Sequence, residues 1–283
     1  MATIEYMPAR LTPKETEDLR QAVACLEGAS FAQRLTDAVG RPVGVLSRTM
    51  PQSARRVIAH VSEIALRGAL KLALRTLDPN ASAKPANRAH KLAAAASGAV
   101  GGALGLAALP LELPISTTIL LRSIAEIARE EGEDLSAPEA AFACVEVFAL
   151  GGQGGGESAF ESGYFAVRAA LAKSVSDSAR FVAAEGVTAQ SAPVIARLIS
   201  QIAARFGVVV SEKLAAQAAP ILGAIGGAAV NAAFADHFQT LARGHFIMRR
   251  LERQHGASVV AFEYQRLRGE RGRDDAESRR AAS

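Results

Sequence analysis

The sequence predicts an all-α protein, a single multi-helix domain built around two hydrophobic helices or helical hairpins that are rich in glycine and alanine. Three observations lead to this prediction. Hydrophobic residues make up 49 % of the 283-residue chain, which is enough to bury a sizeable core. Aromatic residues contribute only 5 % and tryptophan is absent, which favours closely packed helices over sheets. Apolar residues also recur at helical spacing along most of the chain.

The two hydrophobic segments, residues 92–111 and 214–235, are uncharged and of about membrane-spanning length, ~20 residues. Each contains a GxxxG pattern, which allows helices to approach closely in lipid. Glycine inside a helix costs roughly 1 kcal/mol relative to alanine, so its repeated use requires a close contact with another helix or with lipid. The predicted helix-packing residues are Gly98, Gly101, Gly102 and Gly105 in the first segment, and Gly223, Gly226 and Gly227 in the second.

The N-terminal third is predicted from its capping residues. Residues 1–11 are expected to be a flexible N-terminus. Thr12, Pro13 and Glu15 form a capping box that begins a helix ending near Leu26, and Ser30 caps a second helix that ends near Gly40. Residues 53–77 form a strongly amphipathic basic helix, whose polar stripe either is solvated or docks on a membrane surface. The cations predicted to contact such a surface are Arg56, Arg67, Lys71 and Arg75.

The remaining elements follow from periodicity and from the positions of glycine and proline. Helices are expected over residues 115–131, 138–150, 164–184, 193–210 and 234–255, and Gly132 and Gly256 end the first and the last of them. The run GGQGGG at residues 151–156 is expected to be a hinge or mobile loop. The all-α domain therefore spans residues 12–256, and residues 257–283 are expected to be a charged, disordered tail.

Charge is distributed unevenly around the first glycine-rich segment. Residues 41–91 contain ten Lys or Arg and two acids, whereas residues 112–161 contain ten acids and two arginines. By the positive-inside rule, the basic flank indicates a cytoplasmic side close to lipid. The alternative is that the two blocks neutralise each other within a soluble helical bundle. The two cysteines, Cys25 and Cys144, and the polar first 20 residues favour a cytoplasmic protein without a secretory signal.

Several separated blocks of the chain resemble the EcsC protein family. They include ALPLELPISTTILLRSIAEIAREEGEDL at residues 108–135, ACVEVFALGG at residues 143–152 and DHFQTLARGHF at residues 236–246. The resemblance extends over about residues 30–256. It implies a protein named for a gene that lies beside the ATPase and membrane subunits of an ABC transporter, with no settled biochemical activity. The resemblance therefore implies an accessory role near a membrane, without a mechanism.

Five of the residues shared with the family pattern are predicted to form a polar network or to line a pocket. They are Glu112, Thr117, Arg122, Asp236 and His237. Polar side chains close to apolar helix ends are costly to bury unless they are paired. We therefore expect Glu112 to pair with a helix amide or with Arg122, and Asp236 to pair with a basic residue.

The motifs of common catalytic and metal sites are incomplete in this sequence. Ser158 lies in GGGESAF, which lacks the last glycine of a GxSxG nucleophile elbow. His237 and His245 are eight residues apart, without the spacing of a zinc motif. The basic residues lack interleaved aromatic residues, which argues against nucleic-acid binding. We expect no catalytic residue, no metal and no cofactor.

The sequence thus favours a non-enzymatic, cytoplasmic, membrane-associated accessory protein, with a membrane lipid or a membrane protein as its partner. It is expected to be peripheral or partly inserted at the inner face of the cell membrane, and an ABC transporter is the partner that the family resemblance implies. Two alternatives stay open. One is a soluble hydrolase-like enzyme with a polar pocket at the helix ends, and the other is a soluble helical scaffold. The oligomeric state and lipid specificity are not determined by the sequence.

Overall fold

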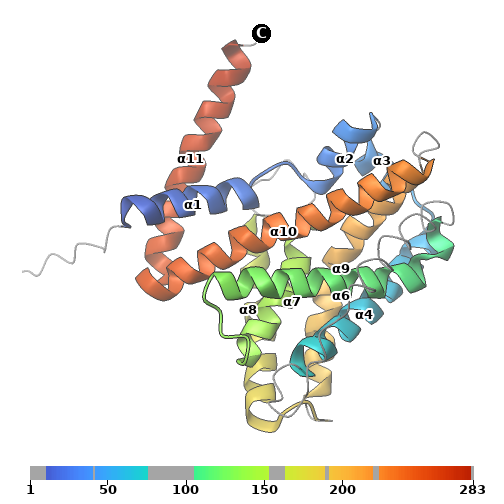
Figure 1. The fold of residues 1–283 in the computed structure, drawn as a ribbon, viewed down its shortest axis with the longest axis horizontal. Helices are drawn as coiled ribbons and strands as arrows, with labels where there is room; N and C mark the ends of the chain where they lie inside the picture. Colours follow the sequence, from blue (N-terminus) through green and yellow to red (C-terminus); the bar gives the residue numbers. More distant parts are fainter. Residues whose placement is uncertain are drawn as a thin grey trace, which may run out of the picture.

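A computed structural model describes residues 11–40, 42–75, 105–152, 163–188, 191–218 and 223–281 (Figure 1). Within these ranges the secondary structure is entirely helical, which confirms the predicted all-α class. The helices are α1 (Pro13–Leu26), α2 (Phe31–Val39), α3 (Val43–Arg48), α4 (Gln52–Arg75), the 3-10 helix η1 (Gly105–Ala107), α6 (Leu109–Glu130), α7 (Pro138–Leu150), α8 (Tyr164–Glu185), α9 (Ala192–Gln217), α10 (Gly223–His255) and α11 (Ala257–Ala281).

Two helices organise the bundle. Helix α9 lies at its centre and contacts α2, α3, α4, α7, α8 and α10. Helix α10 crosses the body, packing on α6 and on α1 (Figure 1). Among the described residues, α9 alone is long and apolar enough to cross a membrane. Helix α9 packs against other helices on several sides. A helix that is buried in this way is apolar because it lies in the core, so its composition is also that of a core helix.

The residues that were predicted to cap the first two helices do so in the structure. The Thr12 hydroxyl accepts a hydrogen bond from the Glu15 backbone N–H at 3.3 Å, and the Thr12 N–H donates to Glu15 Oε2 at 2.7 Å, which completes the capping box. Ser30 caps α2 in the same way through the Gln33 N–H. Gly40 ends α2 with φ +67°, a left-handed conformation that glycine adopts without steric cost.

Helix α6 begins earlier than predicted, at Leu109 instead of residue 115. Pro110 occupies its first turn, where a missing N–H costs nothing, and Pro114 lies inside the helix. Pro114 does not interrupt the helix, although its missing N–H leaves the carbonyl of Pro110 without its helical donor. Gly132, with φ +76°, follows the end of α6 as predicted.

The second glycine-rich segment is shared between two helices. Residues 214–217 form the last turn of α9, and residues 223–235 form the first part of α10. Because α9 and α10 contact each other, the segment fits the predicted hairpin form and not a single continuous helix. Of the first segment, Gly98, Gly101 and Gly102 lie outside the described residues, and Gly105 begins η1.

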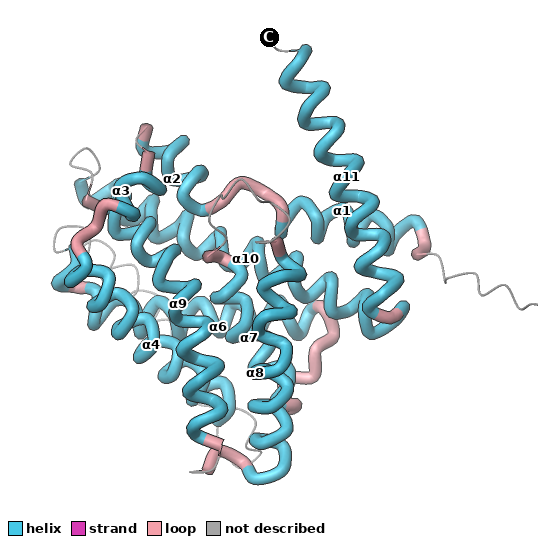
Figure 2. The backbone as a smooth tube through the Cα atoms, turned by 180° about the vertical axis from the view of Figure 1, so that it is seen from behind, coloured by secondary structure: helices cyan, strands magenta, loops and turns pink. Residues whose placement is uncertain are grey.

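The predicted disorder of residues 257–283 is wrong for residues 257–281, which form α11. Val260, Tyr264 and Leu267 recur at spacings of four and three, and this apolar stripe is buried against the body. The Tyr264 hydroxyl also donates to Glu27 Oε1 of the α1 C-terminus at 2.8 Å. The charged second part of α11 projects away from the other helices (Figure 2).

Close packing at glycine occurs at positions that the sequence analysis did not select. A Cβ atom added to Gly244 of α10 would lie 2.7 Å from Leu26 Cγ, because α1 and α10 cross there. Gly152, predicted to belong to a hinge, packs directly against the backbone of Arg205. Gly151 follows the end of α7, and residues 153–156 of the run lie outside the described residues.

Candidate functional site at the root end

The described parts of the two glycine-rich segments meet at one end of the bundle. Helix η1 contacts both the start of α6 and α9, and α9 also contacts α10. We call this the root end, defined by η1, the start of α6, the end of α9 and the start of α10. The starts of α6 and α10 lie at the right of Figure 1, together with α3.

A buried ion pair joins two of these helix ends. Lys213 Nζ of α9 donates to Glu112 Oε1 of α6 at 2.6 Å, and the two side chains are only 2 % and 6 % exposed. The ammonium also lies over the ring of Phe234 of α10, 4.8 Å from its centroid. Burial lowers the pKa of Lys213, and the nearby Glu112 carboxylate opposes this effect. The pair and its aromatic neighbour thus connect α6, α9 and α10.

A small cavity of about 130 Å³ adjoins the ion pair. It is lined mainly by apolar atoms, and its polar groups come from three helices; the lining residues are Glu112, Ser116, Ile119, Leu120, Lys213, Asn231, Phe234 and Ala235. The amide oxygen of Asn231 is buried and has no hydrogen-bond partner among the described residues.

Of the predicted polar residues, Glu112 is the one that reaches this cavity. Glu112 does not pair with Arg122, which was one of its two predicted partners; its ion-pair partner is Lys213. Arg122 is exposed and lines a separate cavity with Leu72 and Cys144. Arg122 follows Glu112 by ten positions, which corresponds to ~15 Å along α6. Thr117 is fully buried on the same helix, and its hydroxyl has no partner among the described residues.

Asp236 and His237 face α2 instead. Asp236 has the basic partner that was expected: Arg34 Nη1 lies 3.2 Å from its Oδ2, and the Asp236 side chain is 63 % exposed. His237 is buried between the rings of Phe31 and Phe238, with centroid distances of 5.1 and 5.3 Å. Burial, reinforced by the charge of Arg34, lowers the pKa of His237 to about 4. Within the part of the chain that the structure describes, the five predicted residues therefore do not line one of the cavities together.

The predicted membrane-surface cations lie on the outer face of α4. Arg56, Arg67 and Lys71 are exposed, and the side chain of Arg75 lies outside the described residues. Arg67 forms an ion pair with Glu63 one turn away, whereas Arg56 and Lys71 have no acidic partner among the described residues. Of the predicted helix-packing residues, Gly223 and Gly226 lie at the start of α10, and Gly227 is buried there.

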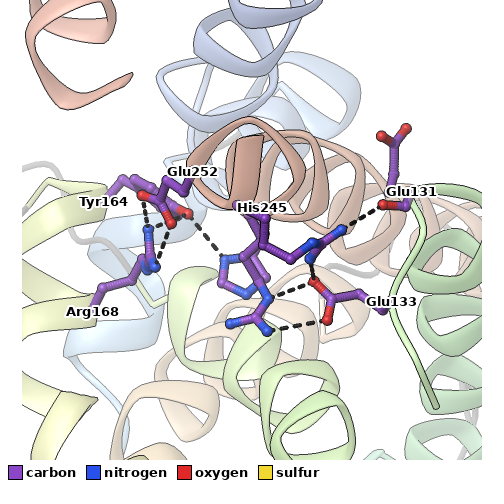
Figure 3. A network of polar contacts seen from close by, with 8 residues as sticks. Glu131, Glu133, Tyr164, Arg168, His245 and Glu252 are labelled. Carbon is purple, nitrogen blue, oxygen red and sulfur yellow. Dashed lines mark hydrogen bonds and ion pairs between the residues drawn. The ribbon is translucent and has the colours of Figure 1, made fainter. Parts of the chain in front are cut away.

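A second polar network, at the other end of α10, was not predicted (Figure 3). Arg168 of α8 binds both carboxylate oxygens of Glu252 at 2.7 and 2.9 Å, and the Tyr164 hydroxyl lies 3.1 Å from His245 Nδ1. Arg249 binds Glu133, which follows α6, in the same bidentate way at 2.8 and 3.1 Å. These pairs attach α10 to α8 and to the α6–α7 connection.

Sequence reasoning also missed Lys213, the partner of Glu112. A signal was present, because the dipeptide Glu212-Lys213 interrupts the otherwise apolar second half of α9. Two adjacent charges in a helix that is apolar on most sides must reach solvent or partners. In the structure both are buried: Lys213 reaches Glu112, and Glu212 accepts a hydrogen bond from the Ala32 backbone N–H of α2.

Comparison with known proteins agrees with the sequence blocks described above. The profile of the EcsC protein family matches residues 5–251, which cover most of the chain and include every helix from α1 to α9 and most of α10. The match includes Glu112 and Lys213 of the buried ion pair and the exposed face of α4. No curated protein and no solved structure matches the chain. The chain therefore belongs to the EcsC protein family.

Proposed function

We propose that this protein is a non-enzymatic accessory protein that associates with the cytoplasmic face of the cell membrane, and that the outer face of α4 contacts anionic lipid. The observation that carries the proposal is the combination of cations and aliphatic side chains on that face. A membrane transporter, the partner that the family resemblance implies, would meet the protein at the same surface.

The geometry of α4 supports this proposal. Successive residues of an α-helix are about 100° apart, so Arg56, His60, Arg67 and Lys71 lie within an arc of about 60°. Val57 and Ile64 lie beside that arc, and their side chains are 40 % and 49 % exposed. A surface helix with cations next to exposed aliphatic groups is typical of binding in the interfacial region of a bilayer.

The charge balance of the surrounding segment points to the same partner. Residues 42–75 contain six Lys or Arg and one acid, Glu63. Each cation close to an anionic membrane contributes about 1 kcal/mol to binding. Three such cations would therefore account for a substantial part of the affinity, provided that the salt concentration is low enough to leave them unscreened.

The test is binding of the purified protein to lipid vesicles, with and without anionic phospholipid. Replacing Arg56, Arg67 and Lys71 with glutamine should weaken binding to anionic vesicles at least about tenfold, since three cations are removed. The matched control replaces three exposed cations on other helices with glutamine, namely Arg20, Lys173 and Arg180. It removes the same total charge and should retain most of the affinity.

Two results would contradict the proposal. Equal losses in the α4 variant and the control would mean that only net charge matters, and the α4 face would then have no special role. A wild-type protein that stays in solution with both kinds of vesicle would favour the soluble scaffold. The enzyme alternative gains no support from the predicted residues, because among the described residues Glu112 and Arg122 line different cavities and Asp236 pairs with Arg34 of α2.

A further inference from the structure

Four exposed aliphatic side chains belong to α3, η1 and the start of α6, which are elements at or beside the root end. Val45 and Leu46 of α3 are 58 % and 37 % exposed, Leu106 of η1 is 38 % exposed, and Leu111 of α6 is 72 % exposed. Single exposed aliphatic residues are common on soluble proteins and need no explanation. Several of them at one end of a molecule, beside a basic surface, are typical of a contact with an apolar partner.

The exposed residues of α3 and those of η1 and α6 are connected through the last turns of α9. Helix α3 packs on α9, and Lys213 of α9 binds Glu112 at the start of α6. Helix α9 holds both the helix that carries Val45 and Leu46 and the helix that carries Leu111. The packing of α3 on α9 and the buried Lys213–Glu112 pair thus connect the helices that carry the exposed side chains.

The exposed pair on α3 is held in place next to arginine side chains. Val43 and Ser47 are the buried face of α3, which leaves Val45 and Leu46 on its outer side. Arg55 of α4 donates to the backbone oxygens of Arg48 and Met50 at 2.6 and 3.1 Å and so fixes the corner between α3 and α4.

Cations also surround that corner, because Arg48, Arg55 and Arg56 are all exposed. The corner continues directly into the basic outer face of α4. An occupant of this end must therefore be apolar in its interior and negatively charged at its surface. An anionic phospholipid bilayer has both properties.

We infer that the root end inserts Val45, Leu46 and Leu111 into the boundary between headgroups and acyl chains of an anionic bilayer, while Arg48 and Arg56 contact the phosphates. This inference rests on the proposed membrane association and adds which end of the molecule enters the lipid. It also orients the bundle, since the described parts of the two glycine-rich segments lie at the same end.

The absence of tryptophan from the chain provides a direct test. Leu46→Trp and Leu111→Trp each introduce a single fluorescent reporter at the root end. On addition of anionic vesicles, both variants should show a blue shift of their emission, and lipids brominated on the acyl chains should quench it. Val187→Trp and Phe262→Trp are matched controls, because Val187 and Phe262 are 65 % and 70 % exposed and lie on other parts of the molecule. Their emission should stay unchanged.

A binding measurement separates this inference from the proposed function. The triple change of Val45, Leu46 and Leu111 to serine should lower vesicle affinity about tenfold or more, and most of this loss should persist at high salt, because burial of apolar groups is not screened by ions. Reporters at positions 46 and 111 that stay unquenched on vesicle-bound protein would overturn the insertion and leave the α4 contact standing. A protein that binds no anionic vesicle would overturn both.

Discussion

Removing Lys213 tests the ion pair that joins α6 to α9. In Lys213→Met, a side chain of similar length fills the space, but the Glu112 carboxylate, only 6 % exposed, keeps its burial and loses its partner. Breaking one partner of a buried pair costs about 3–5 kcal/mol. For a domain of this size, about 1 kcal/mol lowers the melting temperature by about 2–4 °C. The expected decrease is therefore about 6–20 °C, measured by thermal and urea unfolding.

A double variant that removes both charges tests whether the loss of stability comes from the unpaired buried charge. In Glu112→Leu with Lys213→Met no charge remains buried, so most of the stability lost in either single variant should return, as is found when buried pairs are replaced by apolar residues. Asp236→Asn is the control, because its pair with Arg34 is exposed and should contribute about 1 kcal/mol or less. Single variants that unfold within about 1 kcal/mol of the wild type would refute the role of the pair.

Two further predictions concern packing and pH. Gly244→Ala should destabilise the protein by about 1–3 kcal/mol through overpacking at the α1–α10 crossing. The control Gly68→Ala on α4, which has open space around it, should be neutral or stabilising. Equal changes in the free energy of unfolding of the two variants, measured by chemical unfolding, would contradict the close contact of α1 and α10 at Gly244. The folded-state pKa of His237 is lowered from 6.5 to about 4, so the unfolded chain binds the proton first and stability falls as the pH falls through this window. Relative to His237→Phe, the wild type should lose up to about 3 kcal/mol between these pH values, and parallel stability curves for the two proteins would refute the burial of a neutral imidazole.

Much of the helical framework could be predicted because its signals are local. Capping by Thr12 and Ser30 depends on hydrogen bonds that span three residues. Gly132 and Gly256 mark helix ends because a positive φ is a property of a single residue. The prediction failed at Pro114, where the residues before it continue the helix, and in α11, where an apolar stripe within a highly charged sequence is buried by α1 and α10.

The sequence by itself determined the helical class, most helix ends and the candidate status of Glu112, because these depend on composition, short spacings and an acid placed beside an apolar segment. Only the tertiary structure decided that Glu112 pairs with Lys213, 101 residues away, and that Arg122 on the same helix points elsewhere. Local periodicity gives the face of a helix on which a residue lies, but not which distant helix packs against that face. The pairing of buried charges is decided by that packing, since a charge removed from water is stable only where another helix brings its partner within hydrogen-bonding distance.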